Sequence, residues 1–122
     1  MAAHPIALVH ADLYTPTRRI PDGTVLFVEG QIVAVGPTRE VRLPRRAERI
    51  DAGGRPVTPG LIDLHLHGVE GCDVFGPGLA EAARRLPRYG VTAFVPTTLT
   101  LPEDEILERL AAMARVIESR PA

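Results

Sequence analysis

The first half of the chain carries short apolar runs of the length and composition typical of β-strands. Residues 6–13 are largely apolar, and residues 25–28 form a continuous run of β-formers. The Pro-Asp-Gly sequence at residues 21–23 predicts a turn between these two runs. The Glu-Gly pair at 29–30 separates the second run from residues 31–36, which predicts a β-hairpin.

Shorter strand pieces follow a polar connection that covers residues 37–49. Residues 50–52 and Val57 have the composition of short strands, and a Gly-Gly turn at residues 53–54 lies between them. We therefore expect residues 1–57 to form a small antiparallel β domain, folded as a β-sandwich.

The second half of the chain changes its period. Residues 60–67 and 91–96 are runs of β-formers that predict two strands. Residues 79–86 carry apolar side chains at helical spacing, and Gly90 after them is a typical helix stop. A longer helix is predicted over residues 101–119.

Two features support this longer helix. Thr100 and Glu103 have the spacing of a capping box, which marks a helix start. The apolar positions expected to line one face of the helix are Ile106, Leu107, Leu110, Ala114 and Ile117.

The order strand–helix–strand–helix in residues 58–122 predicts parallel strands joined by right-handed crossovers. Two such units cannot close a barrel or cover both faces of a parallel sheet. We therefore expect the front part of a larger α/β protein. Apolar surface of the second strand and second helix should be exposed, so the chain should self-associate, exchange elements or be poorly ordered there.

Composition and charge exclude several classes of protein. The 122 residues are 45% hydrophobic and 24% charged, which is typical of a globular domain rather than a disordered chain. The net charge of -1 gives no electrostatic case for binding nucleic acid or an anionic membrane. The single Cys72 excludes an internal disulfide and a Cys-rich zinc site. Without a long apolar run or a signal peptide, a cytoplasmic location is expected.

Candidate chemistry lies on the strand predicted over residues 60–67. Asp63, His65 and His67 alternate there, so their side chains should leave the same face. Two imidazoles at this spacing can chelate one divalent cation through neutral nitrogens. The same alternation is also typical of a strand with one face in water. His10, elsewhere in the chain, is expected to be incidental.

The stretch from Pro59 to Gly68, PGLIDLHLHG, strongly resembles the motif of the amidohydrolase superfamily. In that superfamily the His pair opens the metal site on the first strand of a (β/α)8 barrel, and a β-rich segment with a hairpin precedes it. The resemblance implies that residues 58–122 are the first βα units of such a barrel, incomplete in this chain. It also implies that His65 and His67 bind a divalent metal, zinc or iron, and that Asp63 orients them.

Within the superfamily, the chain resembles in particular the N-acetylglucosamine-6-phosphate deacetylase family. Residues 67–73, HGVEGCD, and residues 90–98, GVTAFVPTT, carry this likeness. It implies amide hydrolysis that releases acetate from an amino-sugar phosphate. A metal would activate the carbonyl or a bound water, and an acidic residue would pass the proton to the leaving amine. Some members of the family replace this His pair and keep only the other metal position.

The same resemblance places the remaining metal ligands, the catalytic acid and the phosphate-binding residues beyond residue 122. This chain alone is therefore expected to be inactive. The expected partners are a small sugar-phosphate substrate and further copies of the protein, with no nucleic acid and no membrane. Two alternatives stay open: another amidohydrolase, such as a cyclic-amide hydrolase or a deaminase, and a non-catalytic truncated product.

Overall fold

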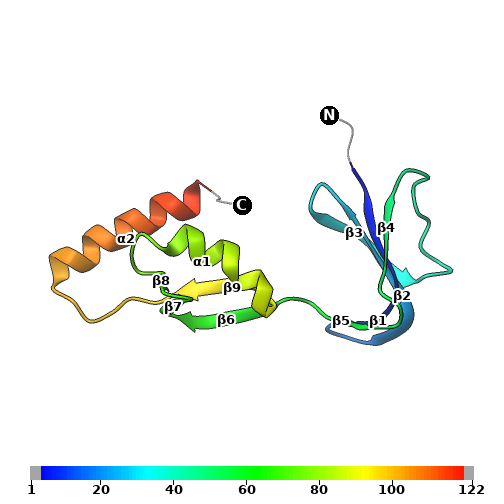
Figure 1. The fold of residues 1–122 in the computed structure, drawn as a ribbon, viewed down its shortest axis with the longest axis horizontal. Coiled ribbons are helices and arrows are strands. Elements are labelled where there is room, and N and C mark those ends of the chain that lie inside the picture. The colour runs from blue at the N-terminus through cyan, green and yellow to red at the C-terminus, as the bar shows by residue number, and fades with distance from the viewer. Residues whose placement is uncertain (1–3, 120–122) are drawn as a thin grey trace. The chain divides into compact units, whose positions relative to one another are not determined.

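The computed structural model describes residues 4–119 of the chain. The chain forms two compact units, Met1–Pro59 and Gly60–Ala122 (Figure 1). The first unit is built from strands, and the second combines strands with helices. This agrees with the predicted α/β class with a β-rich N-terminal part.

The first unit is one mixed sheet. Its strands are β1 (Ile6–Tyr14), β2 (Arg19–Val28), β3 (Gln31–Pro37), β4 (Glu48–Asp51) and β5 (Pro56–Val57). The strand order is β3-β2-β1-β4, and β5 also pairs with β1. Strands β1, β2 and β3 are antiparallel neighbours, but β4 and β5 run parallel to β1.

The prediction of an antiparallel β-sandwich is therefore wrong for residues 4–59, which form a single sheet with two parallel pairings. The connection after β3 causes the difference. It returns the chain to the end of the sheet where β1 begins, and the Glu48 N–H donates to the Pro5 carbonyl there (2.9 Å). From that point β4 can only run alongside β1 in the same direction.

The predicted hairpin between β2 and β3 is confirmed. Its two-residue turn has Glu29 at φ 51° and Gly30 at φ 76°. Positive φ at both turn positions is the geometry that matches the twist of the flanking strands.

The turn predicted at residues 21–23 is wrong, because these residues lie inside β2. The chain instead reverses just before β2, where the Thr15 N–H donates to the Arg18 carbonyl (2.9 Å). Asp22 has φ 48° and His10, on the neighbouring strand β1, has φ 54°. The β1–β2 register is irregular in this region, so the turn-forming residues build a β-bulge rather than a reversal.

The second unit contains two parallel strands, a small hairpin and three helical segments. The strands are β6 (Leu61–Leu66), β7 (Gly68–Val69), β8 (Cys72–Asp73) and β9 (Val91–Pro96), and the helices are α1 (Leu79–Arg85), the 3-10 helix η1 (Leu86–Tyr89) and α2 (Glu103–Glu118). None of the helices in residues 4–119 has the length and apolar content needed to cross a membrane.

The predicted parallel pairing in this unit is confirmed. Ile62 of β6 lies opposite Ala93 of β9, and Asp63 lies opposite Phe94. The helical segment formed by α1 and η1 also ends as predicted, since Gly90 adopts the left-handed conformation (φ 77°) directly after η1.

The core of the second unit centres on a loop that the hydrophobic pattern did not single out. Val74 and Phe75 follow β8 and are completely buried. Around them pack Leu79 and Ala82 of α1 and Met113 of α2. This cluster joins both helices to the end of the strand pair.

Helix α2 differs from its prediction in two respects. It begins at Glu103 with Pro102 as its N-cap and without a side-chain cap, so the predicted capping box with Thr100 is wrong. Its packed face comprises Ile106, Met113 and Val116, and Ile106 alone belongs to the predicted stripe. The helix packs on the Val74–Phe75 cluster, and that contact determines which side is buried.

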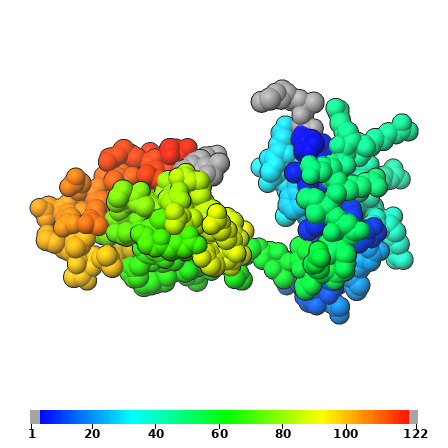
Figure 2. Space-filling model, viewed as in Figure 1, coloured from blue at the N-terminus to red at the C-terminus, as the bar shows by residue number. Residues whose placement is uncertain are grey.

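The rest of the predicted stripe is on the surface, as expected for two βα units alone. Leu107, Leu110 and Ile117 are 59%, 41% and 57% exposed. On the strands, Ile62 and Leu64 are 66% and 74% exposed. Helix α2 forms one outer side of the unit (Figure 2).

We predict that replacing both Leu107 and Ile117 by Gln reduces self-association of the chain. Each side chain would contribute about 1.5–3 kcal/mol if fully buried between copies. Sedimentation velocity over a concentration series measures the effect, with Glu108→Gln on the same helix as the control. A wild-type chain that stays monomeric at all concentrations would contradict the prediction.

Candidate metal-binding site

The two predicted metal ligands lie side by side at the carboxyl end of β6. His65 is the penultimate residue of the strand, and His67 follows its last residue. Their Nε2 atoms are 3.0 Å apart, and the ring planes meet at 74° with centroids 4.8 Å apart. Both residues are exposed. Alternation along the strand therefore brings the two rings to one face, as the sequence predicts.

Main-chain hydrogen bonds on both sides hold this end of the strand. The Thr97 N–H, just after β9, donates to the Leu66 carbonyl (2.8 Å). The Val74 N–H donates to the His67 carbonyl (3.0 Å). Because Val74 is completely buried, the position of His67 is tied to the core of the unit.

Gly68 is needed where the chain leaves the histidines. A Cβ atom at this position would lie 2.6 Å from the Cys72 carbonyl oxygen of the facing strand β8. The missing side chain lets β7 and β8 pair directly after His67. The glycine in the motif therefore has a packing reason in this chain.

The separation of the two Nε2 atoms would allow one metal ion to contact both. Zinc–nitrogen bonds are about 2.0–2.1 Å, so nitrogens 3.0 Å apart would subtend an angle of roughly 95° at a shared ion. That angle suits two adjacent positions of one coordination sphere. Residues 4–119 contain no group of three or more His, Cys, Asp or Glu side chains placed to hold an ion. The pair thus supplies two ligands, one fewer than the three protein ligands usual in catalytic zinc sites.

Asp63 contacts the histidine segment through the main chain. Its Oδ1 accepts a hydrogen bond from the His65 N–H (3.0 Å). This bond orients the backbone of His65 rather than its ring. The role assigned to Asp63 from the resemblance, orienting the two ligands, stays a prediction, as does metal binding by the pair.

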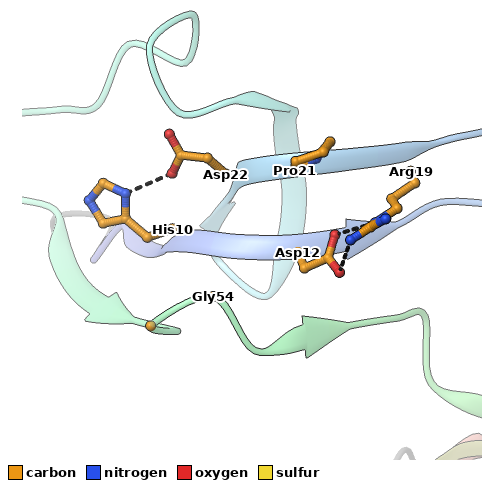
Figure 3. Close-up of a pocket in the computed structure, with 7 residues that line it drawn as sticks. His10, Asp12, Arg19, Pro21, Asp22 and Gly54 are labelled. Carbon is orange, nitrogen blue, oxygen red and sulfur yellow. Dashed lines mark hydrogen bonds and ion pairs between the residues drawn. The ribbon is translucent and has the colours of Figure 1, made fainter.

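A second polar cluster surrounds a cavity of about 480 Å³ in the first unit (Figure 3). His10 Nδ1 lies 2.8 Å from Asp22 Oδ1, across the β-bulge. A carboxylate can only accept, so Nδ1 carries the hydrogen. The sequence predicts no role for His10, because no spacing rule connects positions on two bulged strands.

An Arg–carboxylate pair lines the same cavity (Figure 3). Arg19 donates two hydrogen bonds to Asp12, at 2.8 and 3.0 Å, and its guanidinium lies over the Tyr14 ring. This bidentate pair lowers the pKa of Asp12 below its ordinary value. Both charges are thus matched within the sheet.

The curated proteins similar to the chain include N-acetylglucosamine-6-phosphate deacetylases and imidazolonepropionases, although no protein-family model matches the chain. The chain is 43% identical over 74 residues to the N-acetylglucosamine-6-phosphate deacetylase of Vibrio furnissii, and this alignment covers 58% of the chain and 18% of that enzyme. It is 37% identical over 103 residues to the Homo sapiens N-acetylglucosamine-6-phosphate deacetylase, covering 80% and 22%. An imidazolonepropionase of Acidiphilium cryptum is 43% identical over 107 residues, covering 80% and 25%.

Solved deacetylase structures share the fold of the chain. N-acetylglucosamine-6-phosphate deacetylase from Pasteurella multocida superposes with a TM-score of 0.76 at 23% identity, covering 95% of this chain and 31% of that one. The Mycobacterium smegmatis enzyme, solved with N-acetyl-D-glucosamine-6-phosphate, gives 0.74 at 26% identity, covering 96% and 30%. The chain spans about a fifth of the length of its curated deacetylase relatives and matches their N-terminal portion.

We predict that the His10–Asp22 pair stabilises the first unit at low pH, and that this stabilisation is lost as the pH rises above 6.5. The hydrogen bond from His10 to Asp22 raises the pKa of His10 above 6.5. A raised histidine pKa stabilises the fold fully below pH 6.5, and this contribution is lost as the pH rises through the folded value. The same bond lowers the pKa of Asp22 below 3.8, so the opposite loss occurs only in acid.

An NMR titration of His10 checks this prediction. In Asp22→Asn the pKa of His10 should fall, because the charged acceptor that raises it is lost. Asp51→Asn should lower it less, since Asp51 acts on His10 only through its charge. A pKa of His10 that is the same in the wild type and in Asp22→Asn would refute the pairing.

Proposed function

We propose that this chain is the N-terminal part of a metal-dependent N-acetylglucosamine-6-phosphate deacetylase, in which His65 and His67 are two ligands of a divalent metal, zinc or iron. The observation that carries the proposal is the 3.0 Å separation of the two Nε2 atoms at the carboxyl end of β6. Active sites of parallel α/β folds lie at this end of the strands. The deacetylase relatives support the choice of reaction and of a sugar-phosphate substrate.

The proposed reaction is hydrolysis of an amide to acetate and a free amine. When bound, a divalent metal would supply an electrophile for the amide carbonyl or for a water molecule. The residues of this chain would hold that ion. His65 and His67 would present neutral nitrogens to it, and Asp63 would keep the backbone of His65 in place.

Another amidohydrolase reaction is the second candidate. The match to an imidazolonepropionase is as high in identity as the match to the Vibrio furnissii deacetylase and covers more of the chain. The described residues hold the segment that both groups share. Substrate choice would then depend on residues elsewhere in the protein.

We predict that the 122-residue chain binds one Zn²⁺ through the His pair. His65→Ala or His67→Ala should each weaken binding by at least about 10-fold, since loss of a ligand should cost no less than loss of a residue that supports one. Competition with a chromophoric chelator measures the affinity. His10→Ala is the matched control, because it removes an imidazole outside the site. Equal affinities in all four proteins would refute the metal assignment.

We further predict that the 122-residue chain releases no acetate from N-acetylglucosamine 6-phosphate, because two ligands do not complete a catalytic site. A protein of the length of the deacetylase relatives that contains this segment should release it when loaded with metal. Turnover by the 122 residues alone would contradict the first expectation. A longer protein that hydrolyses a cyclic amide and not the amino-sugar phosphate would favour the second candidate.

A further inference from the structure

The turn between β7 and β8 contains an unfavourable residue in a strained conformation. Gly68 pairs with Asp73 and Val69 with Cys72, so Glu70 and Gly71 form a two-residue turn. Glu70 has φ 47° and Gly71 has φ 77°. Turns of this kind favour Asn, Asp or Gly at the first position, and a long side chain there is uncommon.

The side chain of Glu70 is bound at both carboxylate oxygens. Its Oε1 accepts a hydrogen bond from the Tyr89 hydroxyl (2.5 Å), and its Oε2 accepts one from Arg85 Nη1 (3.1 Å). Arg85 also donates to the main-chain carbonyl of Glu70 (3.2 Å). We call these contacts the Glu70 clasp. They join the tip of the turn to α1 and η1.

The clasp is itself held from the helix side. Arg85 Nε donates to Glu81 on the preceding turn of α1 (2.7 Å), which fixes the guanidinium. The side chains of Glu70 and Arg85 are only 31% and 32% exposed, so water screens their attraction less than at an open surface. In agreement, Tyr89 and Arg85 lower the pKa of Glu70.

The clasp connects to the His pair through the hairpin. The hairpin begins one residue after His67, and the residue after β8, Val74, donates to the His67 carbonyl. A fixed turn tip therefore fixes both the start and the end of the hairpin. The main chain of His67 lies between that hairpin and β6.

From this geometry we infer that Glu70 is a positioning residue for the candidate metal site. The clasp of Glu70 with Tyr89 and Arg85 holds the β7–β8 hairpin. The hairpin in turn keeps the Nε2 atom of His67 within hydrogen-bonding distance of the Nε2 atom of His65. The expected effect on metal affinity rests on the proposed function, because it requires that His65 and His67 bind a metal. The effect of the clasp on the hairpin and on the two rings does not require this.

Glu70→Asn is the decisive variant. Asparagine favours the positive φ of this turn, so the substitution improves the turn conformation while it removes the clasp. If the clasp holds the hairpin, the Val74 amide should exchange faster with solvent in Glu70→Asn. If turn conformation alone holds it, exchange should be unchanged or slower, which would overturn the inference.

The rings provide a spectroscopic readout that a general loss of stability would not produce. In the Nε2–Nε2 contact one ring donates and the other accepts, so the two imidazoles must be opposite tautomers. Long-range ¹H–¹⁵N spectra at neutral pH should show two distinct tautomers in the wild type. They should become averaged in Glu70→Asn. Unchanged spectra would overturn the inference.

Zn²⁺ affinity completes the test. We expect Glu70→Asn to raise the dissociation constant by about 10-fold, the lower end of the effect of residues that support metal ligands. Tyr89→Phe should raise it less, and Glu70→Gln, which keeps an oxygen acceptor, should retain part of the wild-type affinity. Glu108→Gln on α2 is the control and should change nothing. Equal Zn²⁺ affinity in Glu70→Asn and wild type would overturn the role of Glu70.

The two proposals fail in different ways. If His65→Ala does not weaken Zn²⁺ binding, the metal assignment is refuted, and Val74 exchange and the imidazole spectra still decide whether the clasp positions His67. If His65→Ala does weaken binding and Glu70→Asn changes none of the three readouts, the clasp is refuted and the metal site stands.

Discussion

The parallel pairing of β6 with β9 is the interaction on which the second unit depends. Parallel neighbours require a crossover, so α1 and η1 must pass along the sheet before β9 can begin. The pairing also places the carboxyl ends of both strands at one edge, where Thr97 binds the Leu66 carbonyl. The two histidines lie at this edge because β6 ends there. Their convergence is thus a consequence of sheet topology as much as of their spacing.

Much of this arrangement could be predicted from the sequence. Alternation of Asp63, His65 and His67 indicated a shared face, and the helical spacing with Gly90 placed the crossover. The burial of Val74 and Phe75 could not be predicted, since two apolar residues in a glycine-rich loop have no period. Their burial arises from contacts with α1 and α2, which are distant in the sequence.

The errors in the prediction have a common physical origin. Helix α2 carries apolar residues on more than one side, so its pattern permits several packed faces, and the Val74–Phe75 cluster selects one of them. In the same way, residues 21–23 permit either a turn or a bulge, and the partner strand decides between them. Local preference defined the options, and contacts distant in sequence chose among them. The parallel strands β4 and β5 depend likewise on where a polar connection returns.

Positive φ at residues with side chains restricts how this sequence can vary during evolution. Among the described residues, His10, Asp22, Glu29 and Glu70 adopt this conformation. A β-branched side chain would be strongly disfavoured at any of them, whereas glycine or asparagine would be accepted by the backbone. Homologous sequences should therefore drift toward small residues at these positions wherever the side chain has no partner. Retention of a larger residue would identify lineages in which selection acts on its contacts rather than on the turn.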